Sequence, residues 1–431
     1  MNYTAMYRDR LVSVEEAVLS IRSGQTIGTG QFGSTPAAIF EHMPLLQGKA
    51  TGIRTYLPIT TRDFPFMYDP AYRQTFDHTA TFLMAGTRKG FRNGMVQYHP
   101  GDLHNGPFRW IEANGDDVFI TAAAPMDEHG YFCMPLCLIH ERAFLERAKR
   151  VIVEVNPQLP RVLGDTLIHI RDVDMIVEAE RELEILPESE ITARDEAIGR
   201  YVASLVHDGD TIQLGWGGIP DAVAHSLMDK HDLGIHSEML CNAMVDLIEA
   251  GVVTGRKKTW LPGLVVGTFA AGSQRLYDLL NENPGVRLLQ GSLVNDPRVI
   301  SSNDHFVSIN SALSVDLTGQ ICAESLGSMQ YSGSGGQFDM AYGAIHSIGG
   351  CNIIALPATQ KNGTISTITA QLAAGSVVTT TRNIIDYVVT EYGIAQLRGR
   401  SVRQRAENLI AIAHPDFRAE LRKDAEKLAF L

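Results

Sequence analysis

The sequence has no run of eighteen consecutive apolar residues, which is about the length that a membrane-spanning helix requires. Its first ten residues also lack the apolar core of a signal peptide, so we expect a cytoplasmic protein without a membrane partner. Positive charge is not in excess, since the formal net charge is −12. This balance argues against nucleic acid as a partner and leaves room for a local basic pocket that holds a phosphorylated ligand.

Cysteine is scarce, with five residues in 431. An odd and scattered set predicts a reducing compartment rather than a disulfide framework. Cys133 and Cys137 have no second pair or histidine spacing that would complete a zinc site, so we expect small core residues there. Asp127, Glu128 and His129 are adjacent and point in different directions. The sequence therefore predicts no metal site.

Several catalytic motifs are missing from the chain. It contains no G-x-S-x-G nucleophile elbow, no G-x-x-x-x-G-K-[ST] phosphate loop and no pair of carboxylates placed for glycoside hydrolysis. Residues 28–33 match G-x-G-x-x-G. Because residues 52–57, about twenty positions further on, hold no acidic side chain for a ribose hydroxyl, this match predicts a nicotinamide site only weakly.

The chain does contain one pattern twice. Residues 23–43 and 208–228 share a polar turn at glycine, a Thr-Ile strand, a glycine loop and a proline at the start of a helix. The spacing is far too long for a solenoid. The repeat therefore predicts two related open α/β domains in tandem, and the acidic, aperiodic stretch at 181–190 places their boundary near residue 187, giving domains 1–187 and 188–431.

The second copy has the features of an anion site. A strand at 211–214 leads into a glycine turn and a helix that Pro220 is expected to open at its first position. Free N–H groups at a helix start favour phosphate, carboxylate or an oxyanion. A further strand at 233–236 is expected to present Glu238 at its carboxyl end, where open α/β sheets bind ligands. The glycine loop at 331–339 offers more backbone donors.

Apolar runs and helical spacing predict the remaining elements of the fold. A helix at 243–250 should stop at Gly251, a favourable residue just past a helix end. The C-terminal residues from Arg398 onward should be helical. Further strands are expected at 118–125, 150–156, 260–270, 304–309, 351–357, 376–380 and 386–391, and a helix at 141–150.

The residues alone leave the role of Glu238 open. It can act as a covalent nucleophile, with backbone donors placed for the oxyanion of an acyl intermediate. It can equally form a salt bridge at the end of a strand.

Six segments, read in order, resemble the acetyl-CoA hydrolase/transferase family: residues 234–239, 308–313, 315–320, 332–337, 388–395 and 412–418. Within that family the chain is most similar to 4-hydroxybutyrate and butyrate:acetate CoA-transferases. The likeness extends over nearly the whole chain and includes residues 125–132 and 151–157. So many separate motifs in one order make chance agreement implausible.

The resemblance implies a class I CoA-transferase of two open α/β domains with the active site between them. Glu238 falls at the position of the family nucleophile. The implied reaction moves CoA from an acyl-CoA to a free carboxylate such as acetate, by a ping-pong route through an acyl-glutamyl anhydride and a glutamyl-CoA thioester. Gly335 and Gly336 match the loop whose backbone N–H binds the oxyanion. The implied CoA-binding residues are Gln213, Gly215, Trp216, Gly217, Gly218, Ile219, Asn310, Gly333 and Gly335.

The resemblance further implies that CoA is a substrate rather than a tightly bound cofactor, and that the chain forms a homodimer or a larger homo-oligomer. Residues 241–243 read Cys-Asn-Ala where relatives tend to have Ser-Asp-Gly. Basic residues expected of relatives are replaced at Ser328, Tyr342, Cys351 and within 364–367. These departures leave the acyl-CoA donor and the carboxylate acceptor open.

Two other functions remain as alternatives. Acyl-CoA hydrolysis requires only that water reach the acylated glutamate. A non-catalytic acyl-CoA or sugar-phosphate binding module would use a related fold. The intact Glu238 and the absence of an appended DNA-binding segment both argue against such a module.

Overall fold

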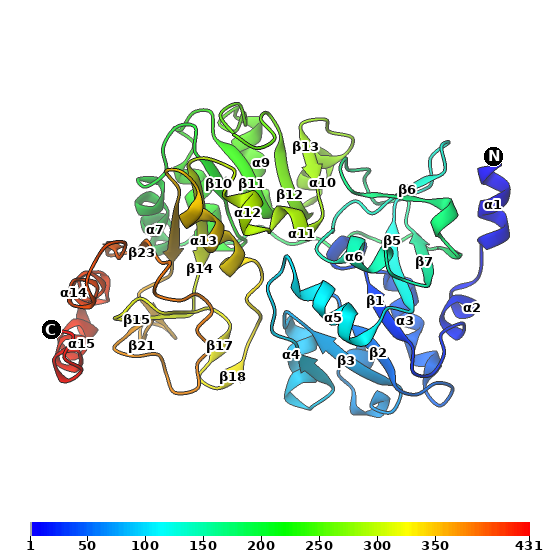
Figure 1. Cartoon of the computed structure of the whole chain (residues 1–431), viewed down its shortest axis with the longest axis horizontal. Coiled ribbons are helices and arrows are strands. Elements are labelled where there is room, and N and C mark those ends of the chain that lie inside the picture. The colour runs from blue at the N-terminus through cyan, green and yellow to red at the C-terminus, as the bar shows by residue number, and fades with distance from the viewer. Residues whose placement is uncertain (1) are drawn as a thin grey trace. The chain divides into compact units, whose positions relative to one another are not determined.

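A computed structural model describes residues 2–431 as an α/β chain that divides into two compact units (Figure 1). Unit 1 holds the chain up to Leu186 together with residues 266–293, and unit 2 holds residues 187–265 and 294–431. Among residues 2–431 we find no helix with both the length and the apolar character needed to cross a bilayer. The domain limits 1–187 and 188–431 stay a prediction.

Unit 1 is built on a seven-stranded sheet of order β4-β3-β2-β1-β5-β7-β9, and every neighbouring pair in it is parallel. A small antiparallel pair, β6 and β8, lies outside this sheet. The strands are β1 (Thr26–Thr29), β2 (Ile53–Tyr56), β3 (Phe76–Ala80), β4 (Val96–Tyr98), β5 (Val118–Ala123), β6 (Tyr131–Cys133), β7 (Arg150–Val155), β8 (Leu167–His169) and β9 (Met175–Glu178).

The helices of unit 1 lie before and between these strands, whose parallel pairing requires crossover connections. They are α1 (Tyr3–Arg10), α2 (Val14–Leu19), α3 (Ala37–His42), α4 (Ala85–Arg92), α5 (Gly106–Asn114) and α6 (Glu141–Leu145), with short 3-10 turns at Phe32–Ser34, Met43–Leu46, Pro65–Met67, Pro70–Tyr72 and Ile170–Asp172. The later segment of unit 1 carries most of β12 (Val265–Ala270), α10 (Gln274–Leu280), β13 (Val286–Leu288) and most of α11 (Gly291–Val294).

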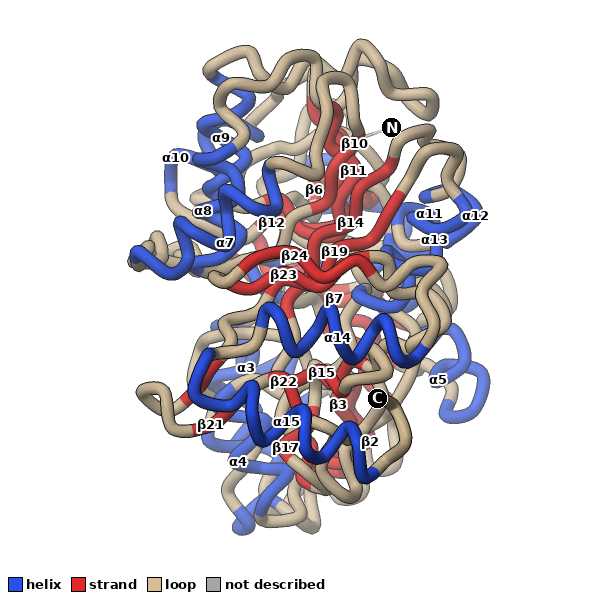
Figure 2. The backbone as a smooth tube through the Cα atoms, turned by 90° about the vertical axis from the view of Figure 1, so that its left-hand side faces the viewer, coloured by secondary structure: helices blue, strands red, loops and turns tan. Residues whose placement is uncertain are grey.

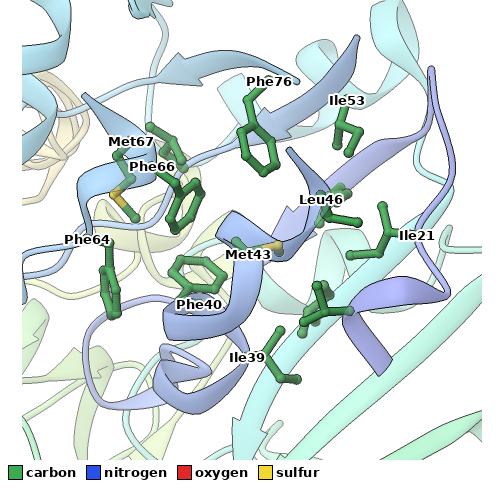
Figure 3. Packing of buried hydrophobic residues seen from close by; sticks show 14 of the residues in the cluster. Ile21, Ile39, Phe40, Met43, Leu46, Ile53, Phe64, Phe66, Met67 and Phe76 are labelled. Atoms are coloured by element: carbon green, nitrogen blue, oxygen red, sulfur yellow. The ribbon is translucent and has the colours of Figure 1, made fainter. Parts of the chain in front are cut away.

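The core of unit 1 packs α3 and the following turn beside β1 to β3 (Figure 3). Phe40 lies edge-on to Phe66 with ring centroids 5.4 Å apart, and Met43 and Phe76 belong to the same buried cluster. Every residue of β5 is buried. Strands covered on both faces are expected to be apolar throughout, which explains the continuous hydrophobic run predicted at 118–125.

Unit 2 contains six strands in the order β11-β10-β14-β19-β23-β24. All pairs among them are parallel except β23 with β24. The bounds are β10 (Thr211–Gln213), β11 (Gly234–Leu240), β14 (Phe306–Ser311), β19 (Cys351–Ala355), β23 (Tyr387–Thr390) and β24 (Gly393–Gln396). Minor strands are β15 (Ser314–Asp316), β16 (Ile321–Cys322), β17 (Ser325–Leu326), β18 (Met329–Gln330), β20 (Thr359–Gln360), β21 (Ile365–Ser366) and β22 (Ile368–Thr369).

The helices of unit 2 are α7 (Ala193–Ala203), α8 (Gly218–Ser226), α9 (Asn242–Glu249), α12 (Pro297–Ile300), α13 (Gln337–His346), α14 (Val402–Ile412) and α15 (Pro415–Lys427). The predicted C-terminal helices are confirmed: α14 packs against β24, and α15 packs against α14 (Figure 2). Leu409 and Ile410 of α14 are buried in one cluster with Ile354 and Val388.

The strand order of unit 1 recurs in unit 2. The series β2-β1-β5-β7-β9 corresponds to β11-β10-β14-β19-β23, in both sequence order and direction. The predicted pair of related α/β units is therefore confirmed. In unit 1, β2 to β4 lie on one side of β1 and the later strands β5, β7 and β9 lie on the other. In unit 2, β11 lies on one side of β10 and the later strands β14, β19 and β23 lie on the other. The loop that follows β1 or β10 thus lies where the strand order reverses, the usual ligand position in such sheets.

The predicted strand at 376–380 is wrong. This segment is irregular chain with a bend at Thr379, and its ladder contact with a strand is an isolated bridge from Thr380 to Ile321. Val377 and Val378 are exposed by 39% and 37%. The β-branched residues favour extended backbone, but a strand also needs a neighbour along its length, and this segment has one only at its end.

Candidate active site

The first glycine loop of unit 2 leaves its backbone open. A Cβ added at Gly217 would meet no atom within 4 Å, and one added at Gly215 would meet only Pro220 Cγ, at 3.9 Å. Gly217 has φ of +128°, a conformation that side chains rarely adopt. Trp216 between them is 49% exposed, and Gly218 and Ile219 are partly exposed at the start of α8. A ligand can therefore approach this backbone closely.

In the corresponding loop of unit 1, after β1, other residues of the chain occupy the space beside the glycines. A Cβ at Gly28 would overlap the ring of Phe144, one at Gly30 would overlap the carbonyl oxygen of Ser34, and one at Gly33 would overlap the side chain of Leu136. The glycines of the G-x-G-x-x-G match are therefore required for internal packing. This explains the motif without a dinucleotide.

A side chain of β11 and one just after that strand fix the start of the first loop. Ser237 Oγ of β11 donates to Leu214 O at 3.2 Å, and Cys241 Sγ donates to Gly215 O at 3.4 Å. Burial raises the pKa of Cys241 to about 12, so this side chain stays a neutral thiol. Cys241 therefore anchors the start of the loop.

Gln213 and Asn310 lie side by side at the ends of β10 and β14. Asn310 Nδ2 donates to Gln213 Oε1 at 3.2 Å, and Gln213 Nε2 lies 3.4 Å from Asn310 Oδ1. Gln213 Oε1 also accepts from the backbone N–H of Ile309 at 3.3 Å. The structure thus brings together two of the predicted CoA-binding residues at the edge where the strand order reverses.

Glu238 lies within β11 rather than at its end, because the strand continues to Leu240. It is the one residue of β11 that is only partly buried. Its Oε2 accepts a hydrogen bond from Asn295 Nδ2 at 3.0 Å. Asn295 itself is fully buried in the turn before α12. The carboxylate is therefore held in one orientation while part of the side chain stays accessible.

The second glycine loop approaches the same carboxylate. A Cβ at Gly336 would overlap Glu238 Oε2 and lie against Asn295 Nδ2, so any side chain at this position would displace the glutamate. Gly336 caps α13, whose free N–H groups and positive end favour a negative charge. Gly335 has φ of +51°, and Gly333 is buried in the preceding loop.

Burial raises the pKa of Glu238 to about 7. The hydrogen bond from Asn295 lowers the pKa, the charge of Asp339 raises it, and the backbone N–H of Gly336 lowers it. At neutral pH the group is therefore divided between carboxylate and acid. Desolvation makes a carboxylate more nucleophilic, and donors placed beside it can stabilise an oxyanion that forms at the same position.

Two details of the predicted site need correction. Pro220 is the third residue of α8 rather than its first, which the helix tolerates because N–H groups of the first turn have no intrahelical partner. Asn295 was not predicted, since a single asparagine in the run Asn-Asp-Pro-Arg forms no pattern. Among residues 2–431 no group of three or more His, Cys, Asp or Glu side chains could hold a metal ion.

Two family models match the chain. The model of the acetyl-CoA hydrolase/transferase N-terminal domain matches residues 1–187, and that of the acetyl-CoA hydrolase/transferase C-terminal domain matches residues 272–425. Together these ranges cover most of the sequence.

Characterised relatives align over almost the full length. The chain is 41% identical to succinyl-CoA:cyclohexane-1-carboxylate CoA transferase of Geobacter metallireducens, over 99% of this chain and 97% of that protein. It is 40% identical to 4-hydroxybutyrate coenzyme A transferase of Clostridium kluyveri, over 99% and 100%.

Solved structures share the fold. RipA from Yersinia pestis superimposes with a TM-score of 0.95 at 38% identity, covering all of both chains. A 4-hydroxybutyrate CoA-transferase from Porphyromonas gingivalis gives 0.84 at 34% identity, covering 99% of this chain and 100% of that one.

Proposed function

Because the chain belongs to the acetyl-CoA hydrolase/transferase family, we propose that it transfers CoA from an acyl-CoA to a free carboxylate, with Glu238 carrying the transferred groups. The observation that supports this role most strongly is the position of Glu238. Its carboxylate lies between the amide of Asn295 and the Gly336 backbone at the start of α13, with no room for a Cβ at residue 336.

The first half-reaction uses the carboxylate as a nucleophile. A Glu238 oxygen attacks the thioester carbon, the C–S bond breaks, and CoA leaves as a thiolate, which yields an acyl-glutamyl anhydride. The thiolate then attacks the glutamyl carbonyl of that anhydride. The donor acid leaves as a carboxylate, and a glutamyl-CoA thioester remains.

The second half-reaction reverses these steps with a new acid. The incoming carboxylate attacks the glutamyl thioester, the thiolate leaves, and it then attacks the acyl carbon of the new anhydride. Glu238 is released as a carboxylate and no proton is consumed. If water attacks instead of the acid, the product is a free acid plus CoA, which is the hydrolase alternative.

We propose that the first glycine loop binds CoA through its exposed backbone. Gly215 and Gly217 present main chain without side-chain cover, and Gln213 and Asn310 add amide groups at the adjacent strand ends. CoA is then a substrate, and no tightly bound cofactor is needed. Assembly as a homodimer or larger, and a cytoplasmic location, remain expectations.

Covalent labelling tests the role of Glu238. The protein is incubated with an acyl-CoA alone, treated with hydroxylamine or borohydride, digested and mapped by mass spectrometry. We expect the modification on the peptide that contains Glu238 and none in Glu238→Gln, which keeps the size of the side chain but removes the charge.

Glu154 provides a matched control. It is also a buried glutamate whose pKa burial raises to about 7, and its carboxylate accepts from the N–H groups of Ala38 and Ile39. Glu154→Gln should still be labelled on Glu238. Label on another acid, or turnover in Glu238→Gln, would exclude the proposed intermediate; release of CoA without an acceptor acid would indicate hydrolysis.

A further inference from the structure

Two hydrogen bonds join the strand that carries Glu238 to the end of α11 and the turn that follows it. His236 and Glu238 are two positions apart on β11, so their side chains lie on the same face of the sheet. His236 Nε2 lies 2.8 Å from Val294 O. The next residue, Asn295, donates to Glu238 Oε2 at 3.0 Å. Val294, the last residue of α11, and Asn295, the first residue of the turn, are therefore each bonded to one of two alternate residues of the strand.

His236 has the features of a fixed, neutral ring. It is fully buried, and its ring lies edge-on to those of Trp260, at 5.3 Å, and Phe306, at 5.8 Å. Its Nδ1 faces the amide nitrogen of Asn303 at 3.4 Å. Since a carbonyl accepts at one nitrogen and an amide donates at the other, the proton belongs on Nε2.

The charge state of His236 excludes a role as an acid or base. Burial, and then the nearby charge of Lys258, lower its pKa to about 3. Lys258 Nζ donates to Ile235 O at 3.0 Å and to Leu264 O at 2.7 Å, so it stays beside the strand. The imidazole is therefore a permanent hydrogen-bond donor to Val294 O throughout the neutral range.

We propose that His236 is a positioning residue, which acts through Val294 and Asn295 to hold the Glu238 carboxylate in its reactive orientation. The turn has no long helix to fix it, since α12 has four residues. The hydrogen bond to Val294 O fixes the backbone directly before Asn295, from which the Asn295 side chain reaches Glu238. This inference rests on Glu238 being the carboxylate that reacts.

His236→Phe should reveal this role, because it keeps an aromatic ring and loses both hydrogen bonds. We expect kcat to fall on the order of tenfold or more, since misplacement by about 1 Å can cost about a hundredfold in rate. The KM for the acyl-CoA should change little. His236→Gln, whose amide can donate to Val294 O, should recover part of the lost rate.

The pH profile gives a second readout. The titratable group that faces Glu238 is Asp339, and the one that faces His236 is Lys258, whose pKa burial lowers to about 7; neither residue is changed in the variant. Because the Asn295 hydrogen bond lowers the pKa of Glu238, releasing Asn295 should raise that pKa. The acidic limb of kcat/KM should then move to higher pH in His236→Phe.

A double-mutant cycle decides whether His236 acts through Asn295. In an Asn295→Ala background, His236→Phe should cause little further loss of kcat. His78→Phe is the matched control: His78 is buried in unit 1, its Nε2 lies 3.0 Å from Phe66 O, and burial lowers its pKa to about 4. That variant should lower Tm and leave the acidic limb in place.

The outcomes are separable. Independent, multiplicative losses in the cycle, or an unshifted acidic limb in folded His236→Phe, would overturn the positioning role. If His236→Phe does not fold, the cycle is run with His236→Asn, whose shorter amide does not reach Val294 O. Failure to label Glu238 in the unmodified protein would reject the proposed function instead.

Discussion

Glu238 and Glu154 share a raised pKa but differ in the accessibility of the side chain. Burial raises both pKa values to about 7, and backbone N–H groups contact both. Glu154 is 1% exposed, and two N–H groups of α3 hydrogen-bond to its oxygens. Glu238 also has hydrogen-bond donors beside its carboxylate, the Asn295 amide and the Gly336 N–H, but its side chain is only partly buried. Accessibility to the thioester therefore separates the candidate nucleophile from the structural carboxylate.

Gly336→Ala tests the close approach of the second loop to Glu238. The backbone φ of Gly336 is −91°, which alanine adopts freely, so the effect should come from the added methyl group alone. Because that methyl overlaps Glu238 Oε2, the carboxylate must move. We expect the single-turnover rate of glutamyl-CoA thioester formation to fall about a hundredfold or more.

Gly86→Ala is the control for that experiment. Gly86 lies in α4, where an added Cβ meets atoms only at 3.9 Å. Alanine in a helix should leave turnover unchanged and raise stability slightly. If Gly336→Ala keeps normal single-turnover rates, the loop does not constrain Glu238 during the reaction.

At the scale of elements, the glycine loop after β1 and the glycine loop after β10 share one sequence pattern but differ in physical role. Gly30 is required by contact with the chain itself, whereas Gly217 is required by a φ of +128° and borders open space. Gly30→Ala should lower Tm without changing KM in the protein that remains folded. Gly217→Ala should raise the KM for CoA esters with only a modest loss of Tm. Thermal unfolding and initial rates measure both.

The strands and loops at the reversal point could be predicted from the sequence, because glycine, proline and apolar periodicity are local signals. Residues 211–214 and 233–236 were placed on strands, and β10 and β11 confirm them. Local signals predict the ends of elements less well. β11 extends through Glu238 to Leu240, because pairing with a neighbouring strand decides where a strand stops.

Asn295 and the segment 376–380 show what local patterns omit. Asn295 matters because the fold brings a turn 57 residues away to within 3.0 Å of Glu238. Residues 376–380 have the composition of a strand but lack neighbours along their length. Both depend on tertiary contacts, which no short stretch of sequence encodes.

For the whole molecule, Asp116 should make stability depend on pH. It is 5% exposed, neither of its oxygens accepts a hydrogen bond of ordinary geometry within residues 2–431, and the nearby backbone N–H of Gly28 only partly offsets the effect of burial on its pKa. Burial, and then the charge of Asp117, raise its pKa to about 7. A carboxyl group with a higher pKa in the folded chain stabilises the fold below its unfolded pKa and loses that contribution as pH rises to about 7.

Asp116→Asn should therefore stabilise the protein at pH 8 by about 1–3 kcal/mol and much less at pH 5, since each pKa unit corresponds to about 1.4 kcal/mol. Asp117→Asn is a comparison with the opposite sign, partly offset because it also removes the charge that raises the pKa of Asp116. Its hydrogen bond to Lys149, at 2.7 Å, lowers the pKa of Asp117, so its loss should destabilise the protein at pH 8. Urea unfolding at both pH values measures the two effects. If Asp116→Asn changes the free energy of unfolding equally at pH 5 and pH 8, Asp116 is not the source of the pH dependence.

The whole-molecule reaction scheme makes a kinetic prediction that does not depend on which acid is the substrate. If Glu238 carries first the acyl group and then CoA, the donor acid must leave before the acceptor acid reacts. Initial rates against both substrates should give parallel double-reciprocal lines. If both half-reactions pass through similar oxyanions beside Gly336, as proposed, Gly336→Ala should slow both together. Intersecting lines, or a variant that slows one half-reaction only, would indicate direct transfer in a ternary complex and would leave Glu238 without a covalent role.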